Sequence, residues 1–122
     1  MTAILDLPLY EAEIETRSNA DARGSFEFTV DDVPVALTGI AFRLQLRKNL
    51  TDRTAALDAS TASGELAVAG ASNNFLSVSI DDSSMARLPA GEYHFDIRAT
   101  ADGVTVVVLQ GIWTHVHGVT RA

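Results

Sequence analysis

The chain has 122 residues, 47% of them hydrophobic and 20% charged, which suits one globular domain and excludes a disordered segment. It contains no cysteine, which excludes disulfides, thiolate zinc sites and thiol catalysis. The formal net charge is −7 and the nine Lys and Arg residues are scattered, so nucleic acid is not an expected partner.

Apolar and polar residues alternate with a period of two in segment after segment, and turn residues separate the segments. This pattern predicts the β-strands of a sandwich or barrel, since helical periodicity is nearly absent. In chain order, the predicted strands are residues 9–16, 25–30, 40–47, 55–59, 65–68, 75–80, 92–100 and 104–113.

The first two predicted strands differ in their polar faces. Residues 9–16 present a solvated acidic face made by Glu11, Glu13 and Glu15. Residues 25–30 alternate so that the side chains expected inside are Phe26, Phe28 and Val30. The Asp-Asp-Val-Pro segment at residues 31–34 then has turn chemistry, so we expect the chain to reverse there.

Residues 40–47 show the pattern of a central strand. The side chains expected inside are Phe42, Leu44 and Leu46, and those expected outside are Arg43, Gln45 and Arg47. We expect the outward arginines to pair across strands with the glutamates of residues 11–15. Exposed pairs of this kind contribute at most about 1 kcal/mol, so they would set register more than stability.

A short helical turn is predicted after residues 75–80, whose inward side chains are Leu76, Val78 and Ile80. The Asp-Asp-Ser-Ser segment at residues 81–84 is a helix N-cap signal. Met85 and Leu88 are expected to pack this turn over the sandwich.

A hairpin is predicted near the C-terminus. Asp102 and Gly103 form the dipeptide that favours a type I′ turn, so residues 92–100 should pair with a strand that begins at Val104. In residues 92–100, the inward side chains are expected to be Tyr93, Phe95 and Ile97.

The last predicted strand is apolar on both faces, through Val104, Val106 and Val108 on one and Val107 and Leu109 on the other. Either the strand lies in the centre of the fold, or another subunit covers its second face. The possible interface residues are therefore Val107, Leu109 and Trp113. For Trp113 a core position is the favoured alternative, because that is the commoner place for tryptophan.

Two histidines are the only candidate metal ligands with suggestive spacing. His115 and His117 stand two apart near a strand end, so their imidazoles would share one face. A third ligand from His94 requires a strand alignment that the sequence does not give. The favoured interpretation is exposed or interface histidines without a metal site.

Catalytic and cofactor motifs are missing from the sequence. No serine stands in a nucleophile-elbow context, and the eight glycines lack GxGxxG or P-loop spacing. The longest strongly apolar run, residues 104–109, is far shorter than the roughly 20 residues of a membrane helix. The N-terminus also lacks signal-peptide features. We expect no catalytic residues, no cofactor, no membrane partner and no Sec-dependent export.

Taken together, the motifs in residues 9–121 resemble those of small virion-associated structural proteins from tailed phages and prophages. They are Leu-Thr-Gly at residues 37–39, the arginine-bearing strand at 42–47, the strand at 76–80, Pro-Ala-Gly-Glu-Tyr-His-Phe-Asp-Ile at 89–97, and the Gly-Ile-Trp-Thr exit that ends at Val119-Thr120-Arg121. The resemblance implies an immunoglobulin-like β-sandwich similar to the N-terminal domains of some baseplate upper proteins. It supplies no catalytic residues.

The expectation is one all-β domain over residues 1–122, an antiparallel immunoglobulin-like sandwich with one short helical turn. It would serve as a non-enzymatic structural or adaptor subunit of a phage or prophage particle, in the virion or in the host cytoplasm during assembly. Its partners would be other virion subunits and further copies of itself. The alternative is a free-standing carbohydrate- or ligand-binding β-sandwich, which would need several exposed aromatic side chains.

Overall fold

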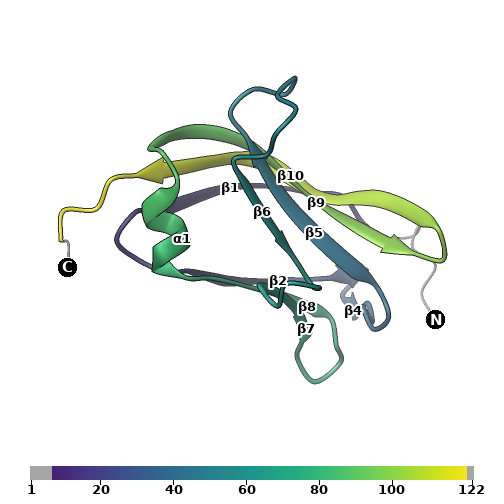
Figure 1. Cartoon of the computed structure of the whole chain (residues 1–122). Helices are drawn as coiled ribbons and strands as arrows, with labels where there is room; N and C mark the ends of the chain where they lie inside the picture. The colour runs from purple at the N-terminus through teal and green to yellow at the C-terminus, as the bar shows by residue number, and fades with distance from the viewer. Residues whose placement is uncertain (1–6, 121–122) are drawn as a thin grey trace.

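Two β-sheets pack face to face, and a short helix lies at one end between them (Figure 1). The computed structural model describes residues 7–120. Their elements are β1 (Tyr10–Arg17), β2 (Ala22–Glu27), β3 (Thr29–Val30), β4 (Val33–Pro34), β5 (Ala41–Arg47), β6 (Leu57–Ser60), β7 (Leu66–Ala69), β8 (Phe75–Ile80), α1 (Asp82–Arg87), β9 (Gly91–Ala101) and β10 (Val104–Val116). No helix among them is long and apolar enough to cross a membrane.

The strand order is that of a variable-type immunoglobulin sandwich. The larger sheet runs β1-β10-β9-β5-β6 and the smaller one runs β2-β8-β7. Neighbouring strands are antiparallel except β1 and β10, which run parallel. In immunoglobulin lettering the larger sheet is G-F-C-C′ with β1 added beside G, and the smaller is B-E-D. The predicted all-β, immunoglobulin-like sandwich with one short helical turn is confirmed.

A hydrogen bond at the start of β9 is a further mark of this fold. Tyr93 donates its hydroxyl to the carbonyl oxygen of Pro89 at 2.5 Å. Immunoglobulin domains carry such a tyrosine corner at the same place, near the start of strand F. Burial raises the pKa of the Tyr93 hydroxyl, which keeps it protonated as the donor.

The apolar core lies between the two sheets, where alternation predicts it. The inward side chains predicted for residues 40–47, 75–80 and 92–100 are all buried, namely Phe42, Leu44, Leu46, Leu76, Val78, Ile80, Tyr93, Phe95 and Ile97. Burial of each large apolar side chain contributes about 1.5–3 kcal/mol before the cost of ordering the chain is counted. This core sets the relative position of the two sheets, and therefore of their edges.

Helix α1 begins where the cap signal predicts. The carboxylate of Asp81 accepts the backbone N–H of Ser84 at 3.1 Å, and this bond is the main reason that the pKa of Asp81 is lowered. Met85 and Leu88 are buried against the sandwich, as predicted. The helix thereby closes one end of the core.

The β9–β10 hairpin also forms as predicted. Asp102 and Gly103 have φ values of +52° and +77°, as a type I′ turn requires, and Val104 pairs with Ala101. A β-bulge at Val108 then shifts the register of β10. The bulge explains why β10 is apolar on both faces, because it changes which side of the strand faces the core.

The second predicted strand is divided in two. Strand β2 starts at Ala22, three residues before the predicted start, and ends at Glu27. Phe28 is fully buried, but Val30 is 44% exposed, so the prediction that Val30 lies inside is wrong. The reason is that β3 leaves the smaller sheet to pair with β4 through the turn at residues 31–32. That turn is the predicted chain reversal.

Candidate functional site

An apolar groove opens along the side of the sandwich between β1 and β2, which lie in different sheets. It encloses about 330 Å³. Its floor consists of core side chains from both sheets, namely Leu44, Val78, Ile97 and Trp113. Its rims are residues 14–17 on β1 and residues 20–26 on β2 and the turn before it. The groove therefore gives access to the core between two strand edges.

Both strands beside the groove are edge strands within residues 7–120. β1 pairs only with β10, and β2 pairs only with β8. Strand β2 therefore presents a row of backbone N–H and C=O groups that no described strand pairs. An apolar groove beside such an edge suits an extended polypeptide, because the edge supplies main-chain hydrogen bonds and the groove receives alternate side chains.

The direction of the β2 backbone groups follows from two hydrogen bonds of neighbouring residues. Phe28 donates its N–H to Asn74 at 2.7 Å, and Ser79 donates its N–H to Glu65 at 2.8 Å. Because these groups alternate in antiparallel strands, even-numbered residues of β2 bond to β8. The N–H and C=O groups of Arg23, Ser25 and Glu27 therefore point to the open edge.

Gly24 leaves the inward side of β2 empty in the middle of the groove. A Cβ built on Gly24 meets no atom within 4 Å. Its inward neighbours on β2 are Ala22, which is buried, and Phe26, which is half-buried. The groove therefore has free space at Gly24, and Phe26 is among the residues that line it.

The charges on the groove rim are paired within their own segments. Arg17 contacts Glu15 at 3.3 Å on β1, and Arg23 contacts Asp21 at 3.4 Å beside β2. Asp21 also accepts the backbone N–H of Asp82 at the start of α1. The rim has no net charge from these pairs, so its apolar floor dominates the chemistry of the groove.

A buried chain of hydrogen bonds lies under the groove. Trp113 donates its indole N–H to the hydroxyl of Thr16 at 2.7 Å, and that hydroxyl lies 2.8 Å from Nδ1 of His115. Nε2 of His115 lies 2.9 Å from the carbonyl oxygen of Met85. A carbonyl only accepts, so Nε2 donates there, and in the tautomer with its proton on Nε2, Nδ1 accepts from Thr16. These hydrogen bonds connect β1, β10 and α1.

These hydrogen bonds correct the interpretation of His115 as an exposed or interface residue. His115 is only 2% exposed, so it is neither an exposed nor an interface residue. Both of its ring nitrogens are engaged in structural hydrogen bonds. His117 is exposed and lies beyond the end of β10 at Val116, so the two imidazoles do not share a strand face. His94 is exposed on the outer face of β9.

The three possible interface residues lie in different surroundings. Leu109 and Trp113 are each 2% exposed and belong to the core, so Trp113 takes the favoured core position and neither residue is a surface contact. The bulge at Val108 turns Leu109 inward. Val107 is 36% exposed and faces outward opposite Arg98. Of the three, only Val107 is accessible to a partner.

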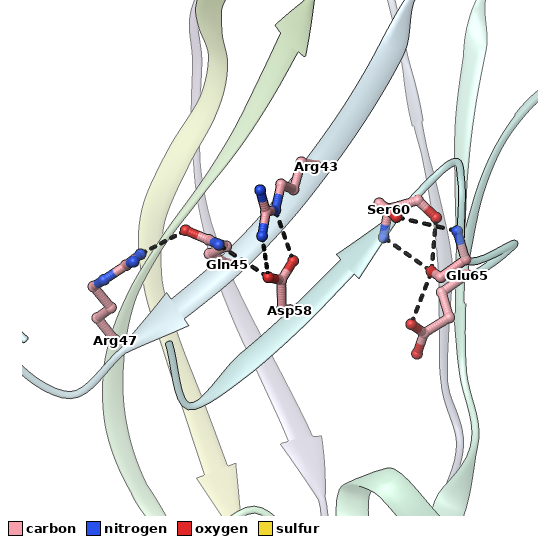
Figure 2. A network of polar contacts seen from close by, with 7 residues as sticks. Arg43, Gln45, Arg47, Asp58, Ser60 and Glu65 are labelled. Atoms are coloured by element: carbon pink, nitrogen blue, oxygen red, sulfur yellow. Dashed lines mark hydrogen bonds and ion pairs between the residues drawn. The ribbon is translucent and has the colours of Figure 1, made fainter. Parts of the chain in front are cut away.

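The predicted arginine–glutamate pairing is wrong, because β10 and β9 lie between β1 and β5. Arg43 instead pairs with Asp58 on β6, and Arg47 donates to Gln45 at 2.7 Å (Figure 2). Asp58 also accepts from Gln45 at 3.0 Å. The hydrogen bond from Arg43 is the main cause that lowers the pKa of Asp58. This exposed network holds β6 against β5.

The outer face of the larger sheet carries a second, shallow depression of about 760 Å³. Most of the side chains that line it are polar or charged, including Glu11, Glu13, Arg47, Asp96 and Gln110. Each of the eight aromatic side chains is buried or half-buried. This face therefore lacks the exposed aromatic rings that a sugar-binding surface requires.

No family model and no curated protein matches the chain. One similar solved structure is murine CRIg, with 14% identity and a TM-score of 0.43 over 93% of this chain and 95% of that one. Another is the structure of extracellular domains 3–5 of Drosophila OTK, with 17% identity and a TM-score of 0.36 over 93% of this chain and 37% of that one. These low scores add nothing to the fold assignment, which rests on the strand order and the tyrosine corner.

Proposed function

We propose that the chain is a non-enzymatic structural or adaptor subunit that binds other protein chains through the groove between β1 and β2. The observation that carries this proposal is the unpaired edge of β2 beside an apolar groove that reaches core side chains. Polar groups that a catalytic site would need, such as His115, are instead engaged in structural hydrogen bonds.

We further propose that the assembly is a phage or prophage particle. The support is the resemblance of the motifs at residues 37–47, 76–80 and 89–97 to those of small virion-associated proteins. A sandwich with an open edge and no exposed aromatic face suits a repeated part of a particle better than a carbohydrate-binding module. The partners would then be other virion subunits.

The test is quantitative mass spectrometry of particles purified after prophage induction in the source organism. The proposal expects the chain in the particles in fixed ratio to their major proteins. Its absence from particles while it is abundant in the same cells would contradict the particle proposal.

A matched pair of variants tests the groove itself. Gly24→Leu adds a side chain where a Cβ meets nothing within 4 Å, so it should fold and fill the groove. Ser79→Leu adds the same side chain on β8, where Ser79 is exposed and pairs with Arg23. Loss of particle incorporation for Gly24→Leu alone supports the groove as the binding surface. Equal incorporation of both variants would contradict it.

A further inference from the structure

The open edge of β2 is complementary to itself. The backbone groups of Arg23, Ser25 and Glu27 point to the edge, as the alternation along β2 requires. A second β2 strand can therefore add in antiparallel orientation only if odd-numbered residues lie opposite odd-numbered residues. This condition leaves few registers.

Within β2, only one of these registers places opposite charges across from each other. With Ser25 opposite Ser25 of the second copy, Arg23 lies opposite Glu27, and their side chains share the outer face of the sheet. Moving one step in one direction places Asp21 opposite Glu27, which repel each other. A further step places Arg23 opposite Arg23. Among the described residues Glu27 has no ion pair of its own, so it is available to Arg23 of the second copy.

The same register also places a side chain of each copy in the groove of the other. Phe26 of one copy then lies opposite Gly24 of the other, on the inward face. The empty position above Gly24 and the groove of about 330 Å³ lie where the ring of Phe26 would enter. Cross-strand pairing of an aromatic ring with a glycine is a known way to cover a bare stretch of strand. By symmetry the two grooves are each filled by the other copy.

We infer that two copies of this chain join edge to edge through β2, antiparallel and with Ser25 on the two-fold axis, so that the smaller sheets form one continuous sheet. The inference rests on the proposed function, since it names the first partner of the same groove. The contact would be held by Arg23–Glu27 pairs outside and Phe26–Gly24 pairs inside.

A single cysteine tests the register directly, because the chain has no cysteine of its own. In a hydrogen-bonded antiparallel pair the Cα atoms lie about 5.5 Å apart, which is within disulfide range. Ser25→Cys should therefore form a covalent dimer under mild oxidation. Ser79→Cys is the control, since Ser79 lies one strand further from the axis. The inference expects crosslinking at least about tenfold faster for Ser25→Cys, and equal rates overturn it.

Charge exchange provides a second, non-covalent readout. Arg23→Glu and Glu27→Arg should each raise the dimer dissociation constant at least about tenfold in sedimentation equilibrium, because each places like charges opposite each other twice. The double variant should restore dimerisation. A wild-type chain that stays monomeric at several hundred micromolar, or that dimerises only after residues 2–6 are deleted, overturns the inference. If a wild-type chain that stays monomeric still enters particles, the proposed function stands without the β2 dimer.

Discussion

Replacing Thr16 with valine removes one hydroxyl from the buried chain of hydrogen bonds while nearly preserving the side-chain volume. Two groups lose their partner, the indole N–H of Trp113 and Nδ1 of His115. A buried polar group without a partner costs about 1–3 kcal/mol, so with two such groups Thr16→Val should lower the free energy of unfolding by about 2–6 kcal/mol. That is a large part of the roughly 5–15 kcal/mol by which a domain is stable.

The measurement is urea denaturation followed by tryptophan fluorescence, with Trp113 as the only tryptophan. Thr16→Ser keeps the hydroxyl and should cost about 1 kcal/mol, because it removes only a methyl group. Thr105→Val removes an exposed hydroxyl that bonds Thr100, so it should change stability by less than about 0.5 kcal/mol. A loss below about 1 kcal/mol for Thr16→Val would refute the assigned donors and acceptors.

Three further variants test other parts of the structure. Gly111→Ala should lower the free energy of unfolding by about 3 kcal/mol or more, because its Cβ would overlap the carbonyl oxygen of Ala12. The control is Gly103→Ala, whose Cβ meets no atom within 4 Å, and it should cost about 1–2 kcal/mol in the same denaturation assay. Asp81→Ala should destabilise the domain at pH 7. The folded pKa of Asp81 is lowered, so the stabilisation from its carboxylate is present above about pH 4 and is lost as the pH falls further. Wild type and variant should therefore have converging stabilities in urea titrations near pH 2. Val107→Lys should stay folded by circular dichroism and keep the β2 dimer, because Val107 is on the other sheet; unfolding would show that its face is internal.

Alternation and turn chemistry were enough to predict most of the fold. Strand β8 has the predicted bounds, and the cap at Asp81 and the turn at Asp102 and Gly103 form as predicted. These features are local, since each depends on residues only a few positions apart. The error at Val30 is not local in origin, because β3 leaves the smaller sheet when it pairs with β4.

The candidate site was far less predictable. The burial of His115 depends on Thr16, which is 99 residues away in sequence, and on Met85 of the helix. The inward position of Leu109 depends on a bulge that period-two alternation does not reveal. The groove requires knowing that β1 and β2 are edges of different sheets. The one local signal was Gly24 between Ala22 and Phe26, an interruption of the inward apolar row.

Hydrogen exchange at β2 tests most directly whether this edge is the surface through which the chain binds other proteins. The amides of Arg23, Ser25 and Glu27 point to the open edge, so they should exchange rapidly in the dilute free chain. In the assembled state, binding through this edge predicts strong protection of these three amides. Unchanged exchange at all three, together with new protection around Val107 on the larger sheet, would contradict it.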